Sequence, residues 1–305
     1  MPRDAAVWTE MGRAAAIALL TACGIALAPA ALFAAQPEPA GPPLSAAPPA
    51  PAPAPPPAHA PPAKSAPPHS AAADEATYER CLALAKSDPG AARDLAEHWQ
   101  SRGGAHPADH CYAVALVGLK HYKEGAEKLE ALAQAMVHAP SSLRAEVLDQ
   151  ASQAWLLAGD PARAYAADTA ALGMLPEDLD ILTDRAEAAG GEGWYDKALA
   201  DLDRVLKSDP NRFDALVYRA TAYRQLGKLD EGLADINRAI ELVPDSVAAL
   251  LERGDILRLK GDNDGARKDW VRVSELAPCS DADAEAKSNI ERLELKEDTL
   301  PPATK

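Results

Sequence analysis

Four potential metal ligands lie close together in one part of the chain: His98, His106, His110 and Cys111. Zinc is held by cysteine and histidine side chains, and its structural sites place these ligands at regular short spacings. The spacings found here fit no usual zinc pattern, and Cys111 has a better use in a disulfide. We therefore expect this protein to bind no metal and no cofactor.

The motifs of phosphate binding and of nucleophilic catalysis are missing from the sequence. Gly190-Gly191-Glu192-Gly193 comes closest to a phosphate-binding loop, but no lysine follows it and no strand pattern precedes it. Neither a nucleophile elbow nor a Cys-x-x-Cys pair occurs. We expect a protein without catalysis of its own. The alternative is an enzyme whose residues are hidden on a helical scaffold.

A period of 34 residues organises the second half of the chain. Four prolines follow it, and we place the units at 145–178, 179–212, 213–246 and 247–280. The period is typical of a repeat made of two helices, and a proline at the end of each unit stops the second helix. The prolines are Pro176, Pro210, Pro244 and Pro278.

Two kinds of small residue recur at the same period. A glycine precedes each proline by 17 residues, and it ends the first helix because glycine adopts left-handed backbone angles at little cost. Five residues later, an alanine or glycine lets the two helices of a hairpin approach closely. The two sets are Gly159, Gly193, Gly227 and Gly261, and Ala164, Ala198, Gly232 and Ala266.

Opposite charges recur in three of the four units. The arginines are Arg185, Arg219 and Arg253, and the aspartates are Asp201, Asp235 and Asp269. In the first unit both positions are alanine, so the two charges appear and disappear together. We predict an ion pair between the two helices of each hairpin, which would set their register more than it stabilises them. The alternative is that these positions are drifted copies of one ancestral surface.

The unit 213–246 resembles the tetratricopeptide repeat family. Arg219 departs from the family, which often has leucine there, and Ile236 stands where an aromatic residue is common. The resemblance covers 145–280 strongly and 108–140 weakly. It implies an all-α fold, a tetratricopeptide-repeat α-solenoid whose hairpins stack into a right-handed superhelix. The signature positions hold Leu216, Ala220, Tyr223, Gly227, Gly232, Ile236, Ala239 and Pro244.

The resemblance also implies where a partner binds, because the first helix of each hairpin lines a concave groove in this family. We single out Tyr218, Thr221, Arg224 and Arg258 as candidate partner contacts, although Tyr218 could equally pack against the neighbouring hairpin. Relatives that clamp a C-terminal carboxylate carry Asn and Lys where this chain has Thr221 and Asp255, which argues against that recognition. The inward positions include Asp149, Gln153, Thr183, Glu187, Val217, Thr221, Arg224, Leu251, Asp255 and Arg258.

Helical patterns continue on both sides of the repeats. Residues 74–140 read as irregular N-terminal hairpins, with helices over 75–86, 90–102, 108–119 and 122–138. The repeats occupy 141–280. A polar helix over 281–297 would cap the exposed end of the solenoid, and 298–305 would be a disordered tail.

Residues 1–35 are typical of a targeting segment. An apolar run over 14–28 follows Arg13 and is short for a membrane span. Leu20-Thr21-Ala22-Cys23 resembles a lipobox, so Cys23 is a candidate for lipidation; the alternatives are an ordinary cleaved signal peptide and an uncleaved anchor. Because the composition favours a bacterial source, each route places the protein in the periplasm.

Residues 36–73 are rich in proline and alanine. Fifteen prolines fall between Pro37 and Pro68, and large side chains are almost absent. Such a segment cannot bury a core, so we expect an extended, disordered linker.

The remaining cysteines fit an oxidising compartment. Cys81 and Cys111 fall in the first and third predicted helices, which stack on the same side of a solenoid. We predict a disulfide between them; the alternative is two buried thiols. Cys279 is then left as a free thiol or as a link between two chains.

The charge of −15 lies in the helical part, because residues 1–70 hold three acidic and three basic residues. An acidic surface repels nucleic acid and anionic lipid, so we expect no nucleic acid, and membrane contact only through the N-terminal segment. It favours a basic protein partner; the alternative is that the charge serves solubility. Our leading hypothesis is a periplasmic scaffold for protein–protein interaction. The alternative is a glycan- or peptidoglycan-binding accessory in envelope assembly, which would need aromatic residues in the groove.

Overall fold

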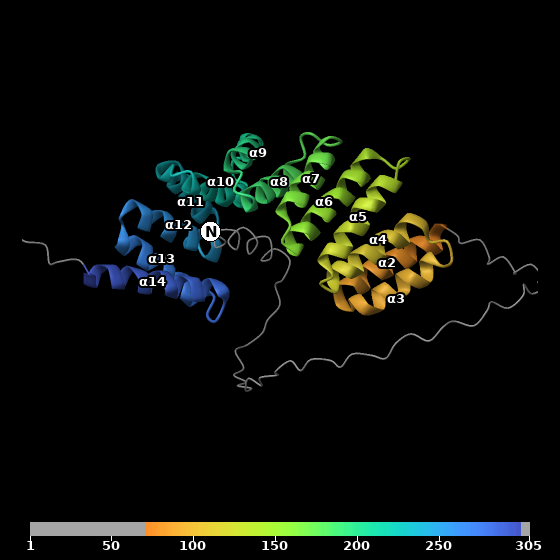
Figure 1. Ribbon diagram of the computed structural model, residues 1–305, viewed down its shortest axis with the longest axis horizontal. Helices are drawn as coiled ribbons and strands as arrows, with labels where there is room; N and C mark the ends of the chain where they lie inside the picture. The colour runs from red at the N-terminus through yellow and green to blue at the C-terminus, as the bar shows by residue number, and fades with distance from the viewer. Residues whose placement is uncertain (1–70, 300–305) are drawn as a thin grey trace, which may run out of the picture. The chain divides into compact units, whose positions relative to one another are not determined.

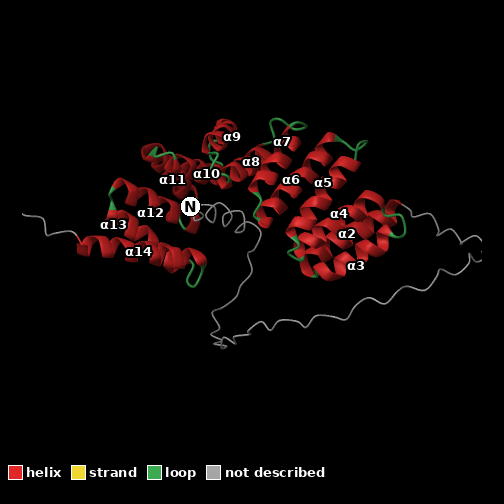
Figure 2. Ribbon diagram, viewed as in Figure 1, coloured by secondary structure: helices red, strands yellow, loops and turns green. Residues whose placement is uncertain are grey.

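Helices make up almost all of the protein that can be described. The computed structural model describes residues 71–299, and within this range the chain forms helices α2 to α14 and no strand (Figures 1 and 2). The all-α prediction is confirmed. The targeting segment, Cys23, the linker up to Ser70 and residues 300–305 lie outside the described residues. None of the described helices is long and apolar enough to cross a bilayer.

The helices follow one another closely along the chain. Their bounds are α2 (Ala71–Ser87), α3 (Pro89–Gln100), α4 (Ala105–Gly118), α5 (Tyr122–Ala135), α6 (Ser141–Ala158), α7 (Pro161–Leu172), α8 (Leu179–Gly191), α9 (Tyr195–Ser208), α10 (Phe213–Gln225), α11 (Leu229–Leu242), α12 (Val247–Lys260), α13 (Asn263–Leu276) and α14 (Asp281–Thr299).

The four predicted units appear as four helical hairpins: α6–α7, α8–α9, α10–α11 and α12–α13. The glycine expected to end each first helix has a positive φ in all four, from 73° to 87°. Gly159 and Gly261 are themselves the residues that cap their helices, whereas α8 and α10 end two residues before the glycine. Any other residue would be strained at these φ values, so the position of each glycine in the sequence determines where the turn forms.

Close packing inside each hairpin depends on the small residues of the second helix. Ala164, Ala198 and Ala266 are fully buried. At Gly232, an added Cβ would lie 3.1 Å from the Ala220 carbonyl oxygen. The hairpins then bury large apolar side chains against their neighbours, among them Trp155, Leu182, Leu202, Ile236 and Trp270.

The predicted ion pairs are present in all three hairpins. Arg185 binds Asp201, Arg219 binds Asp235, and Arg253 binds Asp269, each through two hydrogen bonds of 2.7–2.9 Å. Two parallel hydrogen bonds align the plane of the guanidinium group with that of the carboxylate, so they favour one relative position of the two helices. The pairing is thus confirmed, and its role in setting the register of each hairpin stays a prediction.

The N-terminal hairpins differ from the prediction at their ends. Helix α4 begins at Ala105 rather than at residue 108, because Pro107 fits the first turn of a helix, where a missing N–H costs nothing. Asp88 caps α3 as its side chain accepts a hydrogen bond from the Ala91 amide at 3.0 Å.

The last helix, α14, continues to Thr299, two residues beyond the predicted end.

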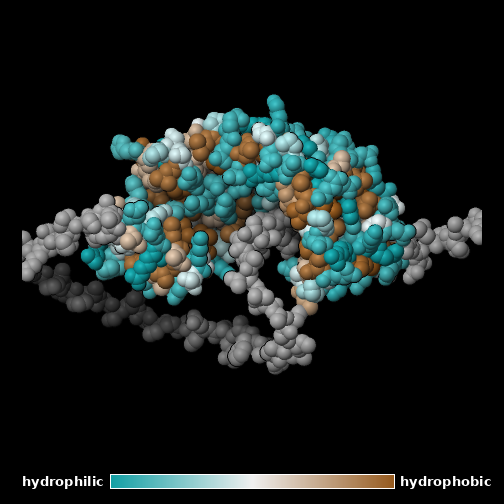
Figure 3. All heavy atoms as spheres, turned by 180° about the vertical axis from the view of Figure 1, so that it is seen from behind, coloured by the Kyte–Doolittle hydropathy of each residue, from teal (hydrophilic) through white to brown (hydrophobic). Residues whose placement is uncertain are grey.

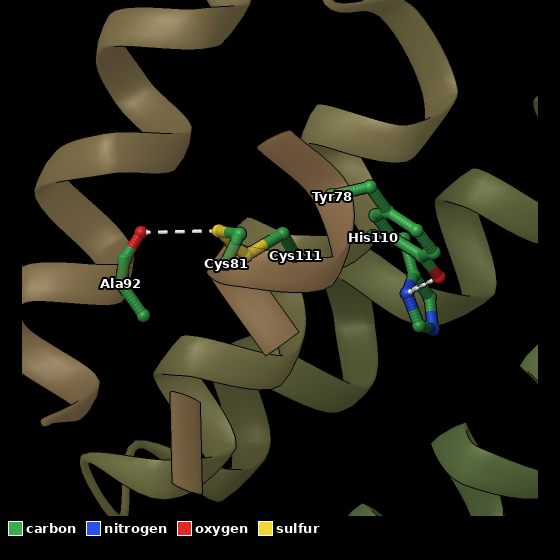
Figure 4. The surroundings of a disulfide bond; sticks show 5 residues. All are labelled: Tyr78, Cys81, Ala92, His110 and Cys111. Carbon is green, nitrogen blue, oxygen red and sulfur yellow. Dashed lines mark hydrogen bonds between the residues drawn. A yellow bond between two sulfur atoms is a disulfide. The ribbon is translucent and has the colours of Figure 1, made fainter. Parts of the chain in front are cut away.

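A disulfide joins Cys81 of α2 to Cys111 of α4, as predicted, and both residues are fully buried (Figure 4). Their Cα atoms lie 6.1 Å apart. The bond connects helices that are separated by α3 in the chain. It therefore ties together the least regular part of the solenoid.

Candidate partner-binding face

The first helices of successive hairpins are connected by polar side chains on one side of the solenoid. Gln153 of α6 donates to Asp184 of α8 at 2.9 Å. The Tyr218 hydroxyl of α10 donates to Glu187 of α8 at 2.7 Å. We call this surface the first-helix face and define it by these residues: Asp149, Gln153, Asp184, Glu187, Tyr218, Arg224, Glu252 and Asp255.

The connection continues toward the C-terminus. Arg224 of α10 donates to both carboxylate oxygens of Glu252 on α12, at 2.7 and 3.1 Å, and Asn289 of α14 donates to Asp255 at 3.2 Å. Only 2% of the Glu252 side chain and 12% of the Arg224 side chain are exposed. This pair is thus an integral part of the packing between two hairpins.

The four candidate contacts predicted from the resemblance do not occupy equivalent places. Tyr218 and Thr221 are buried, and the Thr221 hydroxyl donates to the Val217 carbonyl of its own helix at 3.1 Å. Arg224 is paired with Glu252, while Arg258 is half-buried near Asp255. Their contact with a partner stays a prediction; the structure gives Tyr218, Thr221 and Arg224 a part in holding the fold.

Carboxyl groups crowd the part of the face made by α6 and α8. Burial and the neighbouring Asp184 raise the pKa of Asp149 to about 8. Burial also raises the pKa of Asp184, although the hydrogen bond from Gln153 acts in the opposite direction. For Glu187, burial outweighs the hydrogen bond from Tyr218 and raises the pKa to about 8. Ionisation of these groups is therefore unfavourable as long as no further cation is near.

Few cations balance these acids. Arg212 lies beside α8 and α10, and it binds Asp180 at 2.7 Å and Asp214 at 3.0 Å. Further along the face, burial raises the pKa of Asp255 to about 6, although Arg224 and Arg258 favour its charged form. The face thus combines an excess of carboxyl groups with arginines that are already paired.

Asp184 and Glu252 were missed by the analysis of the sequence, and the period of the repeat could have found them. Both share a position with Gln150 and with the candidate Tyr218, because the four residues stand 34 apart. This position carries the polar contacts from one first helix to the next. A neighbouring position, which holds Thr183, Val217 and Leu251, is buried in the structure.

The first-helix face holds one aromatic residue, the buried Tyr218, and an aromatic pair lies off this face. Tyr165 of α7 and Trp194, just before α9, pack edge to face with ring centres 5.2 Å apart. The Lys197 amino group lies 3.8 Å from the centre of the Trp194 ring. A sugar stacks on an open ring face, and Lys197 covers one face of the Trp194 ring.

The histidines form no metal site in the described part of the chain. His110 is held between Tyr78, whose hydroxyl lies 2.8 Å from Nδ1, and Gln150, whose Oε1 lies 2.7 Å from Nε2 (Figure 4 shows Tyr78). Burial lowers the pKa of His110, which favours the neutral ring. Within the described residues, no three His, Cys, Asp or Glu side chains come together in a way that could hold a metal ion.

Hydrophilic residues cover much of the face drawn in Figure 3, with apolar patches between them. Large apolar side chains that reach the solvent include Val137, Leu143, Leu242, Val243 and Val271. Val137 lies just after α5, Leu143 lies in the first turn of α6, and the other three lie on or just after second helices. None of the five belongs to the first-helix face as defined above.

Comparison with known proteins agrees with this architecture. A family model described as "Tetratricopeptide repeat" matches residues 183–243 and 219–283. The solved structure of a tetratricopeptide repeat protein from Parabacteroides merdae is similar with a TM-score of 0.63. The two sequences are 16% identical, and the match covers 74% of this chain and 88% of that one.

A thermophilic TPR protein of Thermus thermophilus matches with a TM-score of 0.50 and 20% identity, over 61% of this chain and 100% of that one. At such identities the two structures establish the fold alone. No curated protein matches the sequence.

Proposed function

Because this chain is a tetratricopeptide repeat protein, we propose that it is a periplasmic scaffold that holds a protein partner on the first-helix face and catalyses no reaction itself. The observation that carries the proposal is the surplus of carboxyl groups on this face. Burial raises the pKa values of Asp149, Asp184 and Glu187, and repulsion from neighbouring carboxyl groups adds to this effect. A basic group supplied by a partner would relieve that repulsion.

The partner that suits this face is a segment with lysine or arginine side chains. Asp180 and Asp214 extend the acidic surface toward solvent, with 80% and 45% of their side chains exposed. Charges at such a surface accelerate encounter with an oppositely charged partner, and this attraction weakens as salt is added. Binding should therefore weaken between about 0.05 and 0.5 M salt.

The disulfide supports an exported protein. Bonds of this kind persist in oxidising compartments such as the periplasm and are rare in the cytosol. Cys81 and Cys111 are both fully buried, so their bond is part of the folded core. The apolar run over 14–28 supports the same compartment, although it lies outside the described residues.

A pair of charge reversals tests the proposal. The full chain would be crosslinked to its neighbours in the cells that produce it, as wild type and as the double variant Asp180→Lys/Asp214→Lys. The matched control is Glu177→Lys/Asp264→Lys, which changes the net charge equally at residues that are 85% and 99% exposed and lie off the first-helix face. Circular dichroism confirms that both variants keep their helices.

We expect one set of partner proteins to be retained by the wild type and the control, and lost from Asp180→Lys/Asp214→Lys. Equal retention by both variants would contradict binding at this face. If the wild type retains no specific protein at all, the scaffold function itself is wrong.

A further inference from the structure

One core position of the repeat is acidic in the first hairpin alone. Leu202, Ile236 and Trp270 occupy this position in the other three hairpins and are fully buried. The first hairpin carries Asp168 there, and it too is fully buried.

The residue that faces this position changes with it. It is Ala186, Ala220 or Gly254 in the later hairpins and Ser152 in the first. A polar pair has thus replaced apolar packing where α6 and α7 meet.

The polar pair leaves one oxygen without a partner. The Ser152 hydroxyl donates to Oδ2 of Asp168 at 2.6 Å, and Oδ1 of Asp168 is buried with no hydrogen-bond partner among the described residues. An unpaired buried oxygen is costly, and an unpaired buried charge costs far more. Burial accordingly raises the pKa of Asp168 well above its ordinary value.

The charged groups that surround Asp168 do not compensate for its ionisation. Asp149 faces it from α6 and Asp184 from α8, and both carboxyl groups disfavour a further negative charge. Arg185 of α8 is the cation that faces it, but its guanidinium already forms two hydrogen bonds with Asp201, at 2.8 and 2.7 Å. An ionised Asp168 would therefore meet two acids and an arginine that is already bound.

The contacts of the repeat arginines also differ at this junction. The Nη1 atom of each repeat arginine reaches back to the preceding hairpin. Arg219 donates to Asp203 at 2.8 Å and Arg253 to Asn237 at 3.2 Å, whereas Arg185 donates to the Thr169 hydroxyl at 3.4 Å and lies 5.4 Å from the centre of the Tyr165 ring. The hydrogen bond from α8 back to α7 is thus the longest of the three, and its acceptor, like Asn237, carries no charge.

We propose that the packing of α6 and α7 against α8 is a proton-sensitive joint of the solenoid, closed while the Asp168 carboxyl is neutral and opened when it ionises. The closed joint binds a proton that the open joint releases. The stability of the closed joint is therefore complete below the ordinary pKa of Asp168. It is lost as the pH rises through the pKa that Asp168 has in the closed joint. Opening would separate Asp149 from Asp184. An effect of this separation on partner binding rests on the proposed function, whereas the joint itself does not.

Hydrogen exchange followed by mass spectrometry tests the joint. The wild-type chain and Asp168→Asn, which has the same shape without a charge, are compared at equal pH values from 5.5 to 8.5, so that intrinsic exchange rates cancel. At pH 5.5, which is already above the ordinary pKa of 3.8 for Asp168, we expect the smallest difference between the two proteins. At pH 8.5 we expect peptides from α6, α7 and α8 to exchange at least about tenfold faster in the wild type, because one unit of pKa difference is a factor of ten in the opening equilibrium.

A second variant guards against misfolding. Ser152→Ala/Asp168→Leu copies Ala186 and Leu202 of the next hairpin and should be protected at every pH. Peptides from α10 to α13 in the same samples should show no difference. Equal exchange of wild type and both variants at pH 8.5 would overturn the proposal. So would a difference spread evenly over all hairpins, or one removed by Asp149→Asn and not by Asp168→Asn.

Discussion

Arg219 joins Asp235 to Asp203 across two hairpins. Its Nε and Nη2 atoms bind the Asp235 carboxylate at 2.7 and 2.9 Å, while Nη1 binds Asp203 at 2.8 Å. One side chain on α10 thereby holds α11 of its own hairpin and α9 of the preceding one. Arg185 and Arg253 repeat the pair within the hairpin, whereas their acceptors in the preceding hairpin are the neutral side chains of Thr169 and Asn237.

Removing one partner of this pair should destabilise the protein. For Arg219→Ala or Asp235→Ala we expect a loss of about 2–3 kcal/mol in the free energy of unfolding, since each leaves a half-buried charge unpaired. The double variant should lose less than the sum of the two. Urea unfolding measures all three; additive losses would contradict a direct interaction. Arg238→Ala is the control, because its bonds to Glu241 and Asn211 are exposed and an exposed ion pair is worth about 0–1 kcal/mol.

Two glycines should respond differently to alanine. At Gly254 in the middle of α12, a Cβ would lie 2.7 Å from Cδ1 of the buried Trp270 ring. Gly254→Ala should therefore cost about 1–3 kcal/mol through overpacking, although alanine favours helices. Gly227 has open space but a φ of +73°, so Gly227→Ala should cost about 1 kcal/mol, and Gly227→Asn less. Thermal unfolding ranks the three; a stabilised Gly254→Ala would contradict the packing described here.

The disulfide should stabilise the N-terminal hairpins. The bond closes a loop with a sequence separation of 30, which corresponds to about 3–4 kcal/mol in the chain-entropy model. In Cys81→Ser/Cys111→Ser we expect hydrogen exchange to accelerate in α2 to α4, while α8 to α13 stay protected. Cys279→Ser is the matched control, because Cys279 is exposed and unbonded. Unchanged protection of α2 to α4 would show that the bond contributes no stability.

Stability should fall as the pH rises above neutrality. The pKa of Glu187 is about 8 in the folded protein against an ordinary value of 4.5, so the folded state binds the extra proton. Its contribution is complete below the ordinary value and is lost as the pH rises through 8; Asp149 acts in the same sense. We expect the urea midpoint to decrease between about pH 6 and pH 9, and to decrease less in Glu187→Gln. A midpoint that rises over this range would contradict the burial of these acids.

The sequence predicts what depends on the repeat and misses what departs from it. Spacing alone located the hairpins, the glycine turns and the arginine–aspartate pairs. The first hairpin lacks the pair at Ala151 and Ala167, and nothing in the period indicates that Ser152 and Asp168 form a hydrogen bond one position further along. Position 168 also looks like a surface acid until the core position of Leu202 is compared with it.

The first-helix face shows the same limit. The resemblance predicted which positions face inward. The structure buries Thr221, and it places Asp184, which was not predicted, in a contact between two first helices. Neighbouring helices decide which side chains remain accessible. Contacts from one first helix to the next, such as Gln153 to Asp184 and Tyr218 to Glu187, join residues 31 positions apart. Those contacts depend on how successive hairpins rotate against each other, which composition and spacing do not specify.

Site-specific photocrosslinking in the producing cells tests the central claim most directly. A photoreactive side chain would be placed at Asp180 or Arg258 next to the first-helix face and, as controls, at Lys207 or Glu241 on second helices. The account predicts that the same partner is captured from Asp180 and Arg258 and not from the two controls. Capture from Lys207 and Glu241 alone would contradict it, because the partner would then bind the opposite helices of the hairpins.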